Sequence, residues 1–327
     1  MPTSEMIHLR GTPLGVPQFL RRLAAMTAPG EDGLKAAHFK ATGKAALLLA
    51  PQLLILLLFF YIPSWKALSL SVVDIDPFGG TSIFVGLQHF IDLINSPEYQ
   101  NSLVLTFWFV LVQSLATLLI ATVLAFATDQ VVRGRLLYKS VILLPYAIAP
   151  VISGVIWAFL FNPAVGPLAE FLHGLGIPWD PNLRPHDAQI LITAAAVWKH
   201  ICYDYVFLVA AMLSVPQSLR EAAAIDGAGS LRRFLTISLP LITPTVFFLL
   251  VMNFIYGMFD TFGIIHAVTY GGPGGATATL VYKVYQDGFV LMNLGASAAQ
   301  SIILMGLAIL FTILQFRAVE RRVNYRT

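Results

Sequence analysis

The chain has 327 residues, of which 57% are hydrophobic and only 11% are charged. A soluble domain has about 25% charged residues, so this composition excludes an ordinary soluble protein and indicates a surface that faces lipid. The sequence pI is ≈ 9.0, but the basic residues lie at the ends of apolar runs and not on one continuous stripe, which argues against nucleic acid as a partner. Cys202 is the single cysteine, so no intramolecular disulfide can form.

Residues 1–44 are basic and interrupted by prolines, with one short amphipathic stretch. We expect a cytoplasmic basic tail here and not a folded domain. The uncharged run at 45–65 is long enough to cross a membrane and lacks a small-residue cleavage site, so we expect it to be retained as the first span. In the external segment at 67–98, turn-forming residues separate two apolar patches, which we expect on the outer membrane surface.

Two further spans are predicted at about 101–128 and 138–162. Pro145 and Pro150 lie inside the third span, and each proline ring removes a backbone donor, so we expect a kinked helix there. An external loop rich in proline and glycine follows at 163–188. The fourth span, near 189–215, is apolar but is interrupted by ionisable residues.

Residues 216–240 resemble a soluble helix–turn–helix placed between apolar spans. Pro216 marks a break, and Ser218 lies three residues before Glu221, a capping-box spacing that predicts the start of a short helix. Gly227 supplies a flexible turn, and Pro240 is expected to open the fifth span.

The fifth span is predicted at about 240–264, followed by a glycine-rich external loop, an amphipathic stretch at 277–292, and a sixth span at about 294–316. Backbone polar groups cannot stay unpaired in lipid, so each span must be a helix. The sequence therefore predicts an all-α membrane protein with six transmembrane helices. Its permease domain occupies 45–318, between the tail and a second cytoplasmic tail at 319–327.

The basic residues predict the orientation of the spans. Most of the 20 Lys and Arg residues lie in the amino-terminal tail, in the loop at 133–139, in the 216–240 segment and at the carboxyl end. Basic loops stay in the cytoplasm, so both termini and the 216–240 segment are expected to be cytoplasmic.

The 216–240 segment also contains residues at fixed offsets, in the pattern E-A-A-x3-G-x9-I-x-L-P. This pattern resembles the cytoplasmic coupling loop of permease subunits of bacterial ATP-binding-cassette (ABC) importers. Small residues let another protein approach the helix backbone closely. The resemblance implies contact with an ATPase by these residues: Glu221, Ala222, Ala223, Asp226, Gly227, Ile237, Leu239 and Pro240.

Other segments extend the resemblance from about residue 45 to the end. They include Leu143-Leu-Pro-Tyr-Ala147, Phe159-Leu-Phe-Asn-Pro163, Phe259-Asp-Thr-Phe262 and Ser297-Ala-Ala-Gln-Ser301. These segments resemble carbohydrate-uptake permeases, in particular the permeases of sn-glycerol-3-phosphate importers. The resemblance implies the type I importer permease fold and an inner-membrane location. It also implies import of sn-glycerol-3-phosphate or glycerophosphodiesters with three partners: a second homologous permease, an ABC ATPase dimer and a periplasmic solute-binding protein.

The sequence contains no nucleotide-binding loop of its own. A phosphate-binding loop needs G-x4-G-K followed by Ser or Thr, whereas the Gly43-Lys44 pair is followed by Ala45 and lacks the upstream glycine. We therefore expect the chain to be no enzyme and to bind no cofactor or metal. ATP and magnesium would be bound by the partner ATPase.

Polar residues inside the spans are candidates for the solute pathway, because an ionisable group at membrane depth is costly unless it is paired or hydrated. Lys199 could lie near a phosphate-bearing solute, or could instead pair with a group on another helix or extend to the outer surface. In the fifth span, polar residues at helical spacing are expected on one face. The candidates are Lys199, Tyr203, Asp204, Asn253, Tyr256 and Asp260.

Three alternatives remain open. A permease for a neutral sugar or oligosaccharide would have the same architecture, since the substrate rests on family resemblance alone. A secondary transporter or channel would work without an ATPase. A membrane-embedded enzyme would need a cluster of catalytic side chains, and the sequence offers none.

Overall fold

The computed structural model describes residues 42–75, 82–130 and 134–320. The chain divides into two compact units between Phe60 and Tyr61. Helix α2 spans Thr42–Leu56 in the first unit, and the π-helical turn η1 that follows it at Leu57–Tyr61 contains the boundary between the units. The tails expected at 1–44 and 319–327 lie almost entirely outside the described residues.

The second unit begins with a helix, a short β-hairpin and a further helix. Helix α3 (Ile62–Leu70) leads into strands β1 (Val73–Ile75) and β2 (Ser82–Phe84), and then into helix α4 (Gln88–Asn95). The strands pair antiparallel, with Val73 opposite Phe84. This hairpin is the only sheet among the residues that the structure describes, and it was not predicted from the sequence.

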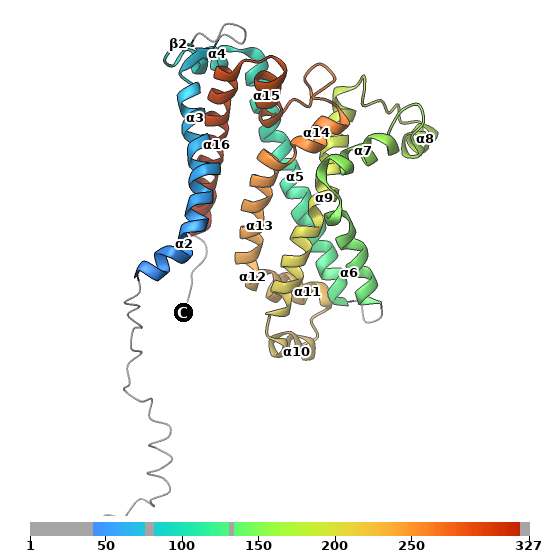
Figure 1. Ribbon diagram of the computed structural model, residues 1–327. Coiled ribbons are helices and arrows are strands. Elements are labelled where there is room, and N and C mark those ends of the chain that lie inside the picture. Colours follow the sequence, from blue (N-terminus) through green and yellow to red (C-terminus); the bar gives the residue numbers. More distant parts are fainter. Residues whose placement is uncertain (1–41, 76–81, 131–133, 321–327) are drawn as a thin grey trace, which may run out of the picture. The chain divides into compact units, whose positions relative to one another are not determined.

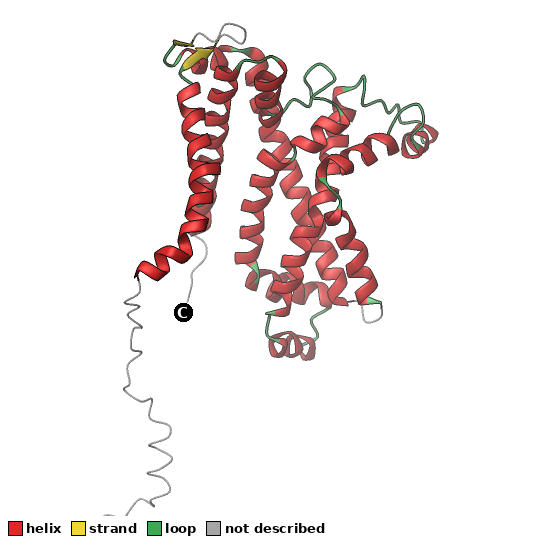
Figure 2. Cartoon of the chain, viewed as in Figure 1, coloured by secondary structure: helices red, strands yellow, loops and turns green. Residues whose placement is uncertain are grey.

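Three long helices confirm the second, fourth and sixth predicted spans. They are α5 (Pro97–Gln130), α9 (Pro185–Leu213) and α16 (Leu294–Glu320), and α5 lies against α9 over much of its length (Figures 1 and 2). Pro97 and Pro185 stand at the first helical position, where the missing N–H costs no hydrogen bond. The described residues contain five helices long and apolar enough to cross a membrane, or up to six if one bent pair counts as a span.

That bent pair is the third predicted span, which is broken and not merely kinked. Helix α6 (Arg135–Leu143) continues into the 3-10 turn η2 (Leu144–Ala147), and α7 (Pro150–Leu160) departs at an angle of 102°. Ile148 and Ala149 are extended between them. An X-Pro sequence disfavours helical geometry in the preceding residue, so Pro150 ends one helix as it starts the next.

The fifth span differs from the prediction at both ends. Pro240 lies in the short helix α12 (Leu239–Leu241), and the span itself begins with α13 (Thr243–Ile255), which has its own proline, Pro244, in the first turn. It ends in the π-helical turn η4 (Tyr256–Asp260), after which α14 (Phe262–Val268) starts separately. Pro240 therefore does not open the span.

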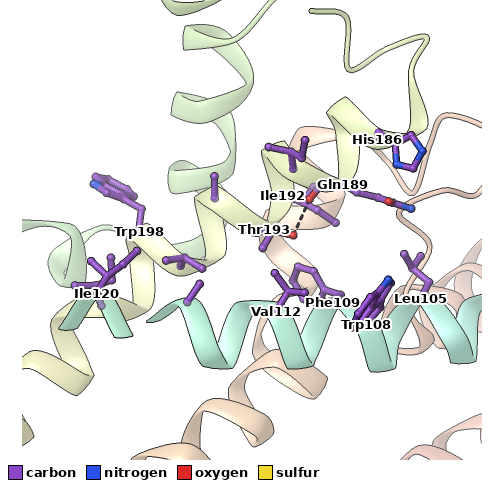
Figure 3. A pocket seen from close by; sticks show the side chains of 15 residues that line it. Leu105, Trp108, Phe109, Val112, Ile120, His186, Gln189, Ile192, Thr193 and Trp198 are labelled. Carbon is purple, nitrogen blue, oxygen red and sulfur yellow. Dashed lines mark hydrogen bonds between the residues drawn. The ribbon is translucent and has the colours of Figure 1, made fainter. Parts of the chain in front are cut away.

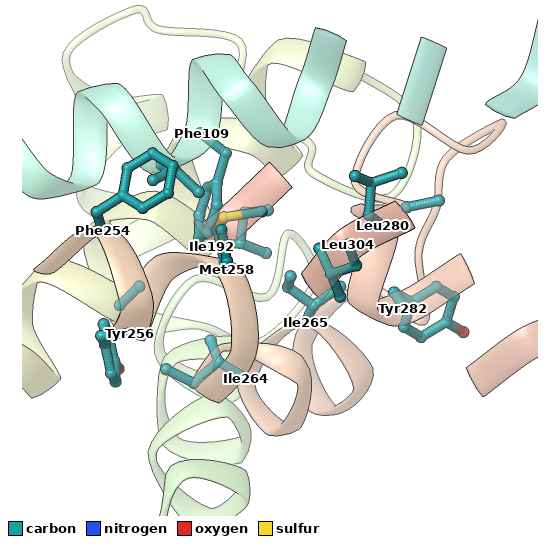
Figure 4. Packing of buried hydrophobic residues seen from close by; sticks show 14 of the residues in the cluster. Phe109, Ile192, Phe254, Tyr256, Met258, Ile264, Ile265, Leu280, Tyr282 and Leu304 are labelled. Carbon is teal, nitrogen blue, oxygen red and sulfur yellow. The ribbon is translucent and has the colours of Figure 1, made fainter. Parts of the chain in front are cut away.

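Shorter helices occupy the connecting segments. Helix α8 (Pro167–Gly174) lies in the predicted loop at 163–188 and was missed, whereas α15 (Leu280–Tyr285) and the π-helical turn η5 (Gln286–Val290) confirm helix in the amphipathic stretch. The main hydrophobic core joins α5, α9, α13, η4, α14, α15 and α16 (Figure 4). Phe109, Ile192 and Met258 meet near its centre.

Candidate functional site

The 216–240 segment contains a short helix, α10, at Gln217–Ile225. The predicted helix start is confirmed to within a residue, but the capping box is wrong, because Pro216 occupies the N-cap position and no side chain caps the helix. Glu221 instead accepts a 2.6 Å hydrogen bond from the side-chain amide of Gln217, one turn earlier. The proline, not a serine cap, sets the start of the helix.

Gly227 ends α10 in a defined turn. Its backbone φ is +80°, in the left-handed region that favours glycine. The Gly227 N–H donates to the Ala224 carbonyl at 3.1 Å, and the Ala228 N–H donates to the Ala223 carbonyl at 2.9 Å. These two bonds form a Schellman motif, which pairs carbonyls that a helix end otherwise leaves free.

No residue of α10 is buried. The Ile225 side chain is 87% exposed and Leu219 is 47% exposed, and Figure 1 shows α10 projecting beyond the ends of the long helices. The small alanine side chains of α10 let another protein approach the helix backbone closely. The geometry therefore supports an interaction surface at α10.

The second half of the segment turns back toward the bundle. Helix α11 (Ser230–Arg233) runs into the π-helical turn η3 (Phe234–Ser238), where Phe234 is buried and its ring lies 4.9 Å from that of Phe126 on α5. The residues of the E-A-A-x3-G-x9-I-x-L-P pattern thus fall into an exposed group and a half-buried group. Glu221, Ala222, Asp226, Gly227 and Pro240 are exposed, whereas Ala223, Ile237 and Leu239 are half-buried.

An ion pair that the sequence analysis missed connects α10 to the end of α5. Arg220 Nη1 lies 3.2 Å from Asp129 Oδ2, and both side chains are about a quarter exposed. Both residues line a polar cavity of 390 Å³ together with Glu221 and Arg233. The two residues are 91 positions apart, so nothing in the local sequence could have paired them.

Lys199 lies against the break in the third span. Its ammonium donates to the backbone carbonyls of Pro145 at 3.1 Å and Tyr146 at 2.9 Å, and lies 5.3 Å from the centre of the Tyr146 ring. A cation is favourable at the carboxyl end of a helix, where carbonyls have no partner. Cys202, one turn along α9, donates its S–H to the Ile142 carbonyl at 2.9 Å. Together these two side chains satisfy carbonyls at the break.

Asp204 and Asn253 form a buried contact between α9 and α13. The Asn253 amide donates a 2.6 Å hydrogen bond to Asp204 Oδ2, and neither residue has any exposed surface. One turn away, the rings of His200 and Tyr256 stack with centroids 3.8 Å apart. Tyr203 lies on the other side of His200, with ring centroids at 5.2 Å.

The three polar residues of the fifth span differ in exposure. Asn253 and Tyr256 are buried, but Asp260 is exposed. The residues Tyr256–Asp260 form a π-helical turn, which has more residues per turn than an α-helix and so rotates the following side chains away from the α-helical spacing. Asp260 therefore does not share the environment of Asn253.

A separate apolar groove of 590 Å³ lies between α5 and α9 (Figure 3). Trp108 and Val112 on α5 face Ile192 and Thr193 on α9 in this view. Among the groove's lining residues only His186 can carry a positive charge. The groove therefore suits apolar groups better than an anionic solute.

Comparison with known proteins defines the class of protein first. A bacterial ABC transporter involved in the import of the acidic polysaccharide alginate matches with a TM-score of 0.74 at 22% identity, over 86% of this chain and 98% of the other. The same kind of transporter in complex with an alginate pentasaccharide-bound periplasmic protein matches with a TM-score of 0.75 at 21% identity, over 85% and 94%. The chain is a multi-pass helical membrane protein with the type I ABC importer permease fold.

The family follows from the sequence matches. The family model described as "Binding-protein-dependent transport system inner membrane component" matches residues 102–325, and the chain belongs to this family. It is 52% identical over 279 residues to the sn-glycerol-3-phosphate transport system permease protein UgpA of Agrobacterium fabrum, covering 85% of this chain and 95% of that protein. It is 47% identical over 288 residues to the protein of the same name from Pectobacterium atrosepticum, covering 88% and 98%.

Proposed function

We propose that the chain is one permease subunit of an ATP-driven importer and that α10 is the surface on which its ATPase acts. The exposed helix between Pro216 and Gly227 carries the proposal, because an alanine-rich helix with no buried residue and a defined end can be moved as a unit by a partner protein. Membership in the family of inner membrane components of binding-protein-dependent transport systems supports it.

The mechanism requires two arrangements of the helices that differ in how they engage the ATPase. A partner can shift an equilibrium only if it binds one state more tightly than the other. Binding of ATP and magnesium by the ATPase would supply that difference, and Glu221 and Ile225 would transmit it from the exposed face of α10. This chain would contribute no nucleotide site of its own.

The orientation forms part of the proposal, with both termini and α10 in the cytoplasm. It can be tested with a single introduced thiol, because Cys202 is the only native cysteine and is buried. In a Cys202→Ala background, Ile225→Cys should react with a membrane-impermeant maleimide in inside-out vesicles and stay unlabelled in spheroplasts. Labelling in spheroplasts would place α10 outside and refute the proposal.

We propose sn-glycerol-3-phosphate or a glycerophosphodiester as the solute, brought by a periplasmic binding protein. The UgpA relatives named above support this substrate class. A neutral sugar or oligosaccharide is the second candidate, since a permease for such a solute would have the same architecture. Uptake of labelled sn-glycerol-3-phosphate, competed by unlabelled sn-glycerol-3-phosphate but not by maltose, would separate the two.

The polar residues of the spans divide into two groups as candidates for the solute pathway. Lys199, Asp204 and Asn253 already have hydrogen-bond partners within the chain and are buried. Tyr203 is half-buried and Asp260 is exposed, so these two can meet a solute without breaking an internal contact. We propose Tyr203 and Asp260 as the first positions to test, because Lys199 and Tyr256 would first have to leave the contacts that they make within the chain.

Co-purification is the experiment that tests the assembly. The full chain, extracted in detergent from its native membrane, should bring down an ABC ATPase and a second permease. The variant Glu221→Lys should lose the ATPase and keep the second permease, while Glu170→Lys, a change of the same charge on α8, should keep both. Solute uptake driven by an ion gradient, with no associated ATPase, would indicate a secondary transporter instead.

A further inference from the structure

The contact between Arg220 and Asp129 joins the exposed helix α10 to the end of a membrane span. Arg220 Nη1 lies 3.2 Å from one carboxylate oxygen of Asp129 and 3.5 Å from the other. The other ion pair between described residues, Lys283–Asp287, links residues four apart in the chain. The Arg220–Asp129 ion pair is thus the one that connects distant parts of the described chain.

Helix α10 has little else to fix its position. It has no buried residue, and it is bounded by Pro216 and by the left-handed Gly227. A polar cavity of 390 Å³ lies beside it, lined by residues of α5, α10, α11 and η3. A surface helix is usually held in place by apolar packing. Because α10 has no buried residue, the Arg220–Asp129 ion pair contributes more to fixing its position.

The helix at the other end of this contact is continuous across the membrane. Helix α5 has 34 residues, and the residue before Asp129, Thr128, shares a buried 2.8 Å hydrogen bond with the Tyr205 hydroxyl on α9. Toward the opposite end of α5, Thr106 Oγ1 accepts a 2.8 Å hydrogen bond from the Leu280 N–H at the start of α15. A displacement of Asp129 therefore acts on a helix that is bonded to two others.

We propose that Arg220 and Asp129 are positioning residues that transmit movement of α10 directly to α5. The inference rests on the proposed function, since movement of α10 matters for transport only if an ATPase acts there. Along the chain, α10 connects back through residues 214–216 to α9 and forward through α11, η3 and α12 to α13. The ion pair adds a direct connection to α5, so that α5 moves together with α9 and α13 when α10 moves.

The test uses the complete importer in proteoliposomes, with its ATPase, second permease and binding protein. Asp129→Asn and Arg220→Gln each remove the ion pair. Each should lower solute-stimulated ATPase activity and uptake about fivefold, equivalent to about 1 kcal/mol. For Asp129→Asn, which changes α5 and not the proposed ATPase surface, basal ATPase activity and co-purification of the ATPase should be unchanged. The matched control is Arg232→Gln, since Arg232 is exposed in the same segment and forms no ion pair with the described residues.

Restoring the charge separates a pairing role from a merely structural one. Arg220→Lys should keep most of the stimulation, and the exchanged pair Asp129→Arg with Arg220→Asp should recover at least half of what either single change loses. Single variants that equal the wild type would overturn the inference. A double variant that is worse than both single variants would overturn it as well, provided Arg220→Lys also fails.

The ATPase activity of the wild-type complex distinguishes a wrong role for the ion pair from a wrong proposed function. A wild-type complex without solute-stimulated ATPase activity would overturn both. A wild-type complex with such activity that is unchanged in Asp129→Asn and Arg220→Gln would overturn only the role of the ion pair.

Discussion

Asn253 donates a 2.6 Å hydrogen bond to Asp204, and through it the fifth span is joined to the fourth where no solvent reaches either side chain. One turn away, the stacked rings of His200 and Tyr256 form a second contact between the same two spans. The remaining oxygens, Asp204 Oδ1 and Asn253 Oδ1, have no hydrogen-bond partner among the described residues. This contact is therefore polar, buried and dependent on few bonds.

Removal of the Asn253 amide should destabilise the protein strongly. Asn253→Leu leaves the carboxyl group of Asp204 buried without its donor, which costs about 3 kcal/mol. Asp204→Asn keeps a side chain of the same shape that still accepts the bond, and should cost about 1 kcal/mol or less. Thermal unfolding of the purified chain in detergent would measure both. Equal stability of Asn253→Leu and the wild type would show that the bond contributes nothing.

The ends of α10 could be predicted from the sequence because the responsible residues act locally. Pro216 cannot continue a helix, and Gly227 adopts the left-handed conformation that ends one. The sequence offsets in the E-A-A-x3-G-x9-I-x-L-P pattern also depend on local structure. The ion pair of Arg220 with Asp129 could not be predicted in the same way, since it depends on how α10 sits beside α5.

The shape of the broken spans also escaped prediction. Pro145 and Pro150 indicate an interruption, but the 102° angle depends on packing of α7 against α14, which lies more than a hundred residues later. The π-helical turn at Tyr256–Asp260 has no sequence signal comparable to a proline, so the departure of Asp260 from the α-helical spacing could not be predicted. Periodicity predicts a face only where the helix stays regular.

Lys199→Met should destabilise the break in the third span. The ammonium donates to the carbonyls of Pro145 and Tyr146, and a hydrogen bond from a charged group contributes about 1.5–3 kcal/mol. We expect a lower unfolding temperature and an unchanged apparent KM for solute uptake. Lys199→Arg, which retains the charge and the donors, serves as the control. A KM raised tenfold or more at an unchanged unfolding temperature would instead identify Lys199 as a solute ligand.

Gly154→Ala should loosen the packing of α7 on α14. A Cβ at Gly154 would lie 2.8 Å from the Ala267 Cβ and 3.1 Å from the Ile264 carbonyl oxygen. Such overpacking costs about 1–3 kcal/mol, because a well-packed core must shift to admit a methyl group. At Gly174 on α8 nothing lies within 4 Å, so Gly174→Ala is the matched control and should leave the unfolding temperature unchanged. Equal unfolding temperatures for both variants would contradict the close approach.

Gly227→Ala should impair coupling without affecting insertion into the membrane. The φ of +80° places Gly227 in the left-handed region, where a Cβ costs about 1–2 kcal/mol, although nothing lies within 4 Å of that Cβ. The strain comes from the backbone alone, and it should displace α10 by disrupting the Schellman turn. Gly229 has equally open surroundings and an ordinary φ of −64°, so Gly229→Ala tests the effect of the methyl group without the strain. We expect Gly227→Ala, and more strongly Gly227→Leu, to lower the uptake per ATP hydrolysed while Gly229→Ala matches the wild type. Neither glycine is buried, so the amount of chain inserted in the membrane should be equal in all variants. Full transport by Gly227→Leu would show that the position of α10 does not govern coupling.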